Sequence, residues 1–262
     1  MRGKWKIKPT AKLKSLEKAL QLLESFGSEN PELSVTDLAE KLSLPRVSVY
    51  RFLKALMGHS LISQNKQTKK YRLGIKVFEL GSTMMKNFPF REISFPLIME
   101  LSKRSGETVH LGVFDNWQVV SIEGVESDQS LRISLPVGKR VCLHSTGIGK
   151  AILAFLTEHE IQEVIKQRGL PKFTNNTITD PNQLMKEVLL IRHRGYAVDD
   201  EENETGIRCV AAPTFDSNRR VIASISISGP SVRIPHGKIS ELSSMVIKTS
   251  QNISKALGYV PK

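Results

Sequence analysis

The stretch Ser34–Lys54, SVTDLAEKLSLPRVSVYRFLK, has the pattern of two short helices joined by a tight turn. Ser34 and Asp37 stand at capping-box spacing, in which a hydroxyl and the acid three residues later satisfy free backbone amides where a helix begins. Pro45 suits the first position of the second helix, because its missing N–H would have no partner there. A similar helical pattern over residues 13–26 precedes the stretch. The sequence therefore predicts a helix-turn-helix, whose second helix buries Val49, Phe52, Leu53 and Leu56.

The other side of this second helix carries hydrogen-bond donors. They are Arg46, Ser48, Tyr50, Arg51 and Lys54. A helix fits the major groove of double-stranded DNA, where such side chains reach phosphates and base edges. An ordinary solvated helix face also carries charges, and for the face alone this alternative stays open. Its place behind a short helix and a tight turn favours a DNA-binding surface.

A basic hairpin follows the helices. Residues 61–64 and 71–73 are strand-like and flank a polar, lysine-rich tip. Three helices followed by such a hairpin predict a winged helix-turn-helix over residues 1–73, with Lys69 and Lys70 beside backbone phosphate. A hairpin that only improves solubility is the alternative.

The charge is distributed unevenly along the chain. Residues 1–90 hold 17 basic and 7 acidic side chains, whereas residues 91–262 hold 21 and 19, within a formal net charge of +12. A uniformly basic protein would carry little information about its partners. A basic segment joined to a nearly neutral one indicates a nucleic-acid-binding module attached to a domain with another task.

Several classes of protein are disfavoured by composition. A hydrophobic content of 40% at 262 residues predicts folded domains rather than disorder. No run of about 18 apolar residues occurs, and the basic opening segment 1–12 lacks the apolar core of a signal peptide. Cys142 and Cys209 lie far apart and have no zinc-site spacing. We therefore expect a cytoplasmic protein with no membrane partner, no metal site and no cofactor.

The remainder of the chain predicts a second domain. Residues 74–90 suggest a helical connector, and Pro89 and Pro96 are expected to precede a helix at about 97–104. The hydrophobic period then changes to that of strands. Hairpins mixed with separate helices predict an α+β fold, a mixed α/β domain over residues 91–262, rather than a parallel repeat. The expected strands are 108–114, 118–122, 210–215 and 221–228, and the expected helices are 149–156, 160–167, 183–193 and 238–257.

Blocks of sequence along the chain resemble the IclR family of bacterial regulators. They are GETVHL at 106–111, HSTGIGKA at 144–151, TITD at 177–180, RGYAVDDEE at 194–202, GIRCVAAP at 206–213 and SISGP at 226–230. The resemblance implies a DNA-binding transcriptional regulator with a GAF-like effector-binding domain. It further implies a homodimer or homotetramer on a palindromic operator, controlled by a small organic ligand.

The resemblance also implies an effector site. Gly147 and Ile148 match positions that hold the effector through backbone amides, and the side-chain contacts match Asp199, Cys209, Ser226 and Ser228. An independent argument supports the first pair, because a helix that begins near Thr146 leaves amides that favour an anion. We therefore expect a small carboxylate metabolite. The isoleucine departs from the alanine of other family members, and its bulk is expected to narrow the site.

Other interpretations of these residues exist. Residues 199–202 also suit an acidic turn, Cys209 suits a small core residue, and serines on a polar strand face are commonly just solvated. A phosphate loop is excluded by His144 and Ala151 where that motif requires glycine and a hydroxyl residue. No Gly-x-Ser-x-Gly motif occurs, and the six histidines have no metal-ligand spacing and are expected to be structural. We expect no catalytic residue; the alternative is a small-acid-processing enzyme that uses Cys209 or His144.

Overall fold

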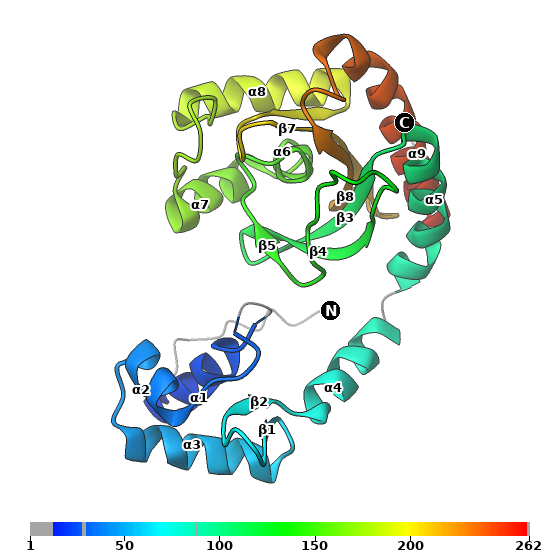
Figure 1. The fold of residues 1–262 in the computed structure, drawn as a ribbon. Helices are drawn as coiled ribbons and strands as arrows, with labels where there is room; N and C mark the ends of the chain where they lie inside the picture. Colours follow the sequence, from blue (N-terminus) through cyan, green and yellow to red (C-terminus); the bar gives the residue numbers. More distant parts are fainter. Residues whose placement is uncertain (1–12, 28–29, 87–88, 261–262) are drawn as a thin grey trace, which may run out of the picture. The chain divides into compact units, whose positions relative to one another are not determined.

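The computed structural model describes residues 13–27, 30–86 and 89–260 (Figure 1). Contacts divide the chain into two compact units, Met1–Phe88 and Pro89–Lys262, and each unit is described by itself. The basic opening segment 1–12 lies outside the described residues.

The N-terminal unit is a winged helix-turn-helix. The predicted capping box is present, since the Ser34 hydroxyl accepts from the Asp37 amide at 3.1 Å and the Asp37 carboxylate accepts from the Ser34 amide at 2.8 Å. Pro45 is the N-cap residue rather than the first helical residue. The elements are α1 (Lys14–Glu24), α2 (Val35–Leu42), α3 (Arg46–Gly58), β1 (Ile62–Gln64), β2 (Tyr71–Leu73) and α4 (Ile75–Lys86).

One apolar core fastens the three helices to the wing. It comprises Leu22, Phe26, Leu33, Leu38, Ala39, Val49, Leu53, Ile62 and Tyr71. β1 and β2 pair antiparallel, and Leu33 pairs with Tyr71 through two backbone hydrogen bonds of 2.9 and 2.8 Å. The segment before α2 is therefore joined to the wing by an isolated β-bridge.

The C-terminal unit is an α+β domain, as predicted. Its strands form a six-stranded antiparallel sheet in the order β5-β4-β3-β8-β7-β6. Helix α6 packs on one face of this sheet and α8 packs against α6, while α5 and α9 cover the other face (Figure 1). The elements are α5 (Pro89–Ser105), β3 (Thr108–Asp115), β4 (Gln118–Val125), β5 (Arg140–Val141), α6 (Gly147–Leu153), α7 (Glu158–Arg168), α8 (Pro181–Arg194), β6 (Ala197–Asp200), β7 (Ile207–Phe215), β8 (Val221–Pro230), the short η1 (His236–Lys238) and α9 (Ile239–Ala256).

One boundary prediction is wrong in an informative way. The helix expected at about 97–104 begins at Pro89 and contains Pro96 in its interior. An internal proline removes one helical hydrogen bond and strains the preceding turn. Phe90, Ile98 and Leu101 are nevertheless buried on both sides of Pro96, and their burial offsets the cost of the proline.

Two short strands were not predicted, β5 and β6. The segment expected as a possible acidic turn begins instead as a strand, because Asp199 and Asp200 pair with Cys209 and Arg208 of β7. Over the residues that the structure describes, no helix is long and apolar enough to cross a bilayer.

Candidate functional site

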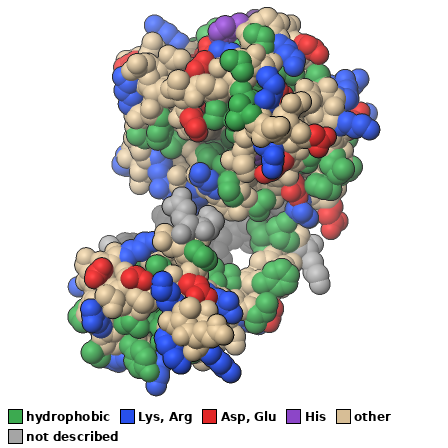
Figure 2. Space-filling model, viewed as in Figure 1, with side chains coloured by type: hydrophobic (Ala, Val, Ile, Leu, Met, Phe, Trp, Pro, Cys, Tyr) green, Lys and Arg blue, Asp and Glu red, His purple; other side chains and the backbone are tan. Residues whose placement is uncertain are grey.

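Helix α3 exposes the predicted set of donors. Arg46, Tyr50, Arg51 and Lys54 are exposed and Ser48 is half-buried. The Lys54 ammonium lies 5.2 Å from the centre of the Tyr50 ring, an arrangement in which the cation and the aromatic face attract each other. The exposed side of α3 is therefore basic and partly preorganised. Figure 2 shows Lys and Arg side chains on the visible face of this unit.

Sequence reasoning missed Val47 on this surface. Its side chain is 74% exposed, although it stands among the donors of α3. An apolar side chain on a helix in the major groove packs against the methyl group of thymine. The indication available in the sequence was an apolar residue on a face that is otherwise polar.

The wing presents its lysines to solvent. Lys66, Lys69 and Lys70 are all exposed, and Lys69 adopts a positive φ of 59° within the turn. The surface formed by α3 and the wing is the candidate DNA interface.

A cavity of about 270 Å³ lies in the C-terminal unit between α6 and the sheet. All six predicted effector residues line it, so residues spread between positions 147 and 228 of the chain meet at one place. They come from three strands and one helix: Gly147 and Ile148 from α6, Asp199 from β6, Cys209 from β7, and Ser226 and Ser228 from β8.

The start of α6 forms one wall of the cavity. Thr146 is the N-cap, and its hydroxyl accepts from the Gly149 amide at 3.1 Å while its carbonyl accepts from the Lys150 amide at 2.8 Å. The amides of Gly147 and Ile148 precede these bonds, and a helix cannot satisfy its first amides internally. A Cβ at position 149 would lie 2.3 Å from the Cys142 carbonyl oxygen. Glycine is therefore required for α6 to sit this close to the preceding chain.

The bulk of Ile148 is accommodated mainly in the core. Its side chain is buried in the apolar cluster of this unit, and its Cδ1 would lie 2.9 Å from a Cβ at Gly112 on β3. The absence of a side chain at Gly112 leaves space for this larger residue.

Neutral polar groups line the sheet side of the cavity. His110 Nδ1 lies 3.4 Å from the Ser228 hydroxyl, which lies 3.3 Å from the Ser226 hydroxyl. Burial lowers the pKa of His110 to about 4, so the imidazole is neutral at pH 7. Burial likewise raises the pKa of the Cys209 thiol far above its usual range. These groups donate and accept hydrogen bonds without adding charge.

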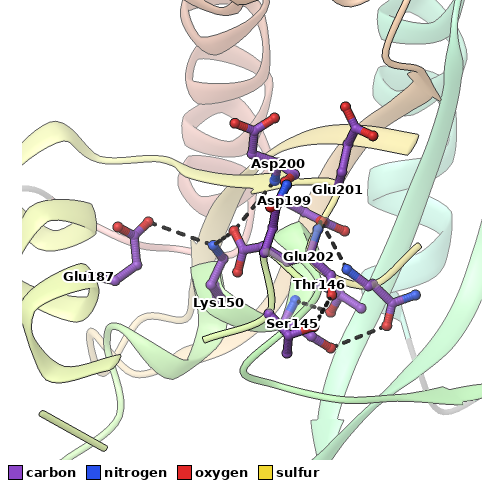
Figure 3. A network of polar contacts seen from close by, with 12 residues as sticks. Ser145, Thr146, Lys150, Glu187, Asp199, Asp200, Glu201 and Glu202 are labelled. Atoms are coloured by element: carbon purple, nitrogen blue, oxygen red, sulfur yellow. Dashed lines mark hydrogen bonds and ion pairs between the residues drawn. The ribbon is translucent and has the colours of Figure 1, made fainter. Parts of the chain in front are cut away.

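Asp199 is the cavity residue whose charge is most sensitive to its surroundings. Its carboxylate accepts from the backbone amides of Glu202 at 2.8 Å and Asn203 at 3.3 Å (Figure 3). Burial, as the largest cause, and the nearby Glu202 carboxylate both raise the pKa of Asp199, whereas the two hydrogen bonds lower it. The result is a pKa of about 7.

An ionic network lies behind Asp199. The fully buried Lys150 ammonium pairs with Glu202 and lies 3.8 Å from Glu187 (Figure 3). Glu187 in turn pairs with Arg194 at 2.8 Å. The network connects α6, α8 and the turn that follows β6. It therefore fixes the turn whose amides hold Asp199.

Sequence reasoning missed other residues of the cavity wall. His110 was expected to be merely structural, but it lines the cavity together with Phe173 and Asn203. His110 is the register partner of Ser226, a relation that becomes available only when β3 is known to pair with β8. Phe173 and Asn203 lie in loops, where no periodicity marks them.

Family models match both units. The model "IclR helix-turn-helix domain" covers residues 15–66, and "Bacterial transcriptional regulator IclR C-terminal" covers residues 82–255. The acetate operon repressor of Salmonella typhimurium is 34% identical over 251 residues, which are 95% of this chain and 92% of the repressor.

Solved structures share the fold. The IclR protein of Thermotoga maritima is 39% identical, with a TM-score of 0.75 over 94% of this chain and 99% of that one. An IclR homologue from Microbacterium hydrocarbonoxydans, crystallised with 4-hydroxybenzoate, is 21% identical, with a TM-score of 0.81 over 93% of this chain and 98% of that one. At that identity the second likeness shows the fold alone.

The raised pKa of Asp199 predicts a pH-dependent stability. An acid whose pKa is higher in the folded state stabilises that state at low pH, and the contribution is lost as pH rises through about 7. A shift of one pKa unit corresponds to about 1.4 kcal/mol. The Asp199 carboxyl should therefore make the free energy of unfolding about 2–3 kcal/mol higher at pH 5 than at pH 8. Asp199→Asn should lose that difference in urea unfolding at the two pH values.

The comparison of wild type with Asp199→Asn isolates this group. The lowered pKa of His110 contributes a pH dependence of opposite sign, which is common to both proteins and cancels. An equal difference between wild type and variant at both pH values would show that Asp199 is ionised throughout.

Proposed function

This chain belongs to the IclR family of bacterial transcriptional regulators, and from that premise we propose that a small organic acid in the cavity controls its action on DNA. The family membership makes it a DNA-binding regulator. The observation that carries the proposal is the convergence of free helix amides and neutral polar side chains on one cavity of about 270 Å³. Regulation of bacterial transcription would place its action in the cytoplasm.

The lining favours a monocarboxylate with a neutral polar end. Helix amides attract an anion, so we place its carboxylate at Gly147 and Ile148. The other end would face Asp199, Cys209, Ser226 and Ser228, where an ionised Asp199 would repel a second negative charge. The volume lies near the lower limit of ligand pockets, which span roughly 300–1,000 Å³. These features support a small hydroxy-, keto- or aromatic acid over a dianion or a phosphate.

The Microbacterium homologue holds a ligand of this class. 4-Hydroxybenzoate carries a carboxylate at one end and a hydroxyl at the other. The proposal for this chain rests on its own cavity, because the likeness between the two proteins is one of fold alone.

A processing enzyme is disfavoured by the chemistry of the two residues that it would use. The thiolate is the reactive form of cysteine, and burial raises the pKa of the Cys209 thiol so that it stays protonated. His144 Nε2 lies 3.0 Å from the Pro171 carbonyl oxygen, so one of its two ring nitrogens is occupied by a structural contact.

The N-terminal unit would bind DNA through two kinds of contact. Arg46, Tyr50, Arg51 and Lys54 of α3 would reach base edges and nearby phosphates, with Ser48 at the margin of the surface. Lys69 and Lys70 of the wing would contact phosphates beside the groove.

The working form would be at least a dimer on a palindromic operator. Two-fold helix-turn-helix proteins place one recognition helix in each half-site. Large apolar side chains exposed on the N-terminal unit favour burial against a second copy. These are Leu16 and Leu20 of α1 and Ile75, Phe78, Leu80 and Met84 of α4.

Substitutions in α3 and the wing should weaken DNA binding in different ways. Arg51→Ala should cost about 1–3 kcal/mol if the arginine reads a base, and the loss should depend on sequence. Lys69→Ala with Lys70→Ala should lower affinity for every sequence and reduce the salt slope by about 1 for each lost phosphate contact. Fluorescence anisotropy on a duplex selected from a random pool by wild type measures both. Lys255→Ala, on α9, is the charge-matched control for Arg51→Ala. Wild-type affinity in a variant that combines Arg51→Ala, Lys69→Ala and Lys70→Ala would refute this interface.

A panel of small acids should identify at least one that raises the melting temperature of the full-length protein. A ligand that binds only the folded state contributes about 2.7 kcal/mol at a concentration of 100 Kd. Ser226→Ala with Ser228→Ala should abolish the shift and leave DNA affinity without ligand unchanged. Ser240→Ala with Ser244→Ala, exposed serines of α9, is the matched control. Unchanged ligand affinity in the first variant would place the effector elsewhere.

Light scattering should give a solution mass of at least two chains. The two-fold arrangement of helix-turn-helix proteins on DNA supplies the reason. A monomer both free and bound to DNA would contradict the palindromic operator.

A further inference from the structure

The tip of the wing is tied to the helical part of the N-terminal unit by one carboxylate. Glu32 lies in the segment between α1 and α2 and faces the hairpin. Asn65 Nδ2 donates to its two oxygens at 3.0 and 3.3 Å, and the Thr68 hydroxyl donates at 3.2 Å. Arg72 Nη1 lies 3.6 Å away. Two side chains from the turn of the hairpin and one from β2 therefore meet at Glu32.

The same donors also hold the turn in its conformation. The Asn65 Oδ1 atom accepts from the backbone amides of Gln67 at 2.9 Å and Thr68 at 3.3 Å, and the Thr68 hydroxyl accepts from the Lys70 amide at 3.3 Å. The side chains that close the turn are thus the ones that anchor it. Moving Glu32 would release the tip that carries the wing lysines.

The position of an acid here is electrostatically unfavourable for DNA binding. Lys66, Lys69 and Lys70 are exposed on the same hairpin, and the Asn65 hydrogen bond holds the pKa of Glu32 below its usual range. An ionised carboxylate near a phosphate backbone repels it. If Glu32 were simply a surface charge, removing it would strengthen binding to DNA.

We infer that Glu32 is a positioning residue for DNA binding, which holds the wing where its lysines reach phosphate. The inference rests on the proposed contact between the wing and DNA. The anchoring outweighs the repulsion, because a screened surface charge acts weakly beyond about 8 Å in physiological salt, whereas a displaced tip loses whole phosphate contacts.

The test compares variants of the full-length protein on a duplex selected from a random pool by wild type. Glu32→Ala should bind at least about threefold more weakly in physiological salt, with a salt slope lower by about 1. Hydroxyl-radical footprinting should show loss of backbone protection beside the major groove, with retention of the protection due to α3. Glu40→Gln is the control, because it removes the same charge from an exposed side chain of α2.

A reciprocal exchange separates anchoring from charge. Glu32→Gln should weaken binding, because an amide cannot accept the full set of donors. Adding Asn65→Asp reverses donor and acceptor and restores the hydrogen bond at the wild-type net charge. We expect the double variant to bind DNA within about twofold of wild type. Asn65→Asp would then improve the DNA binding of Glu32→Gln although it adds a negative charge to the wing. Charge alone would make this second change weaken binding.

The outcomes distinguish this inference from the proposed interface. If Lys69→Ala with Lys70→Ala leaves affinity and salt slope unchanged, the wing does not contact DNA and both ideas fall. If that variant binds more weakly but Glu32→Ala binds as tightly as wild type or more tightly, the inference on Glu32 alone is overturned. Equal melting temperatures of the variants and wild type exclude unfolding as the cause of a loss.

Discussion

The register of the antiparallel sheet is the constraint on which the candidate effector site depends. Asp199 pairs with Cys209, and Cys209 pairs with Ser228, so three strands place polar groups in one row. Ser226 pairs with His110 in the neighbouring row. Successive side chains of a strand point to opposite faces, and a slip of one residue would turn a whole strand's set away from α6. The apolar residues between them, such as Val210 and Ile227, are fully buried and make such a slip costly.

Helix α6 lies across the cavity from this row of side chains. Its position requires both small residues and a buried charge. Gly149 permits the close approach to the preceding chain. Lys150, on the same short helix, is 1% exposed and pairs with Glu202. A buried ammonium is unfavourable unless it is paired, so the turn after β6 must come to α6 for the fold to form. The ion pair of Lys150 with Glu202 thus lies behind the part of the cavity wall that α6 and β6 form.

The N-terminal unit solves a different problem with a smaller core. Its apolar residues come from three helices and both strands of the wing, and they leave the exposed side of α3 free for polar contacts. The tip of the wing extends beyond this core, so polar anchoring replaces apolar packing there. Glu32 supplies that anchor from a segment that precedes the wing by about thirty residues. The two units thus use polar side-chain contacts for placement, buried ones at the cavity and partly exposed ones at the hairpin.

Local sequence patterns were enough to predict the helix-turn-helix, the wing, the α+β class and the uneven charge, because capping boxes, hydrophobic periods and composition can be read without knowledge of the fold. Together with the family resemblance the sequence also named six of the residues that line the cavity. Local patterns did not reveal β6, whose pairing with β7 is decided across the sheet, nor the continuous helix through Pro96, which burial of its flanks permits. They missed His110 and Glu32 for the same reason. The role of each is set by partners more than thirty residues away, which only the tertiary structure brings within hydrogen-bonding distance.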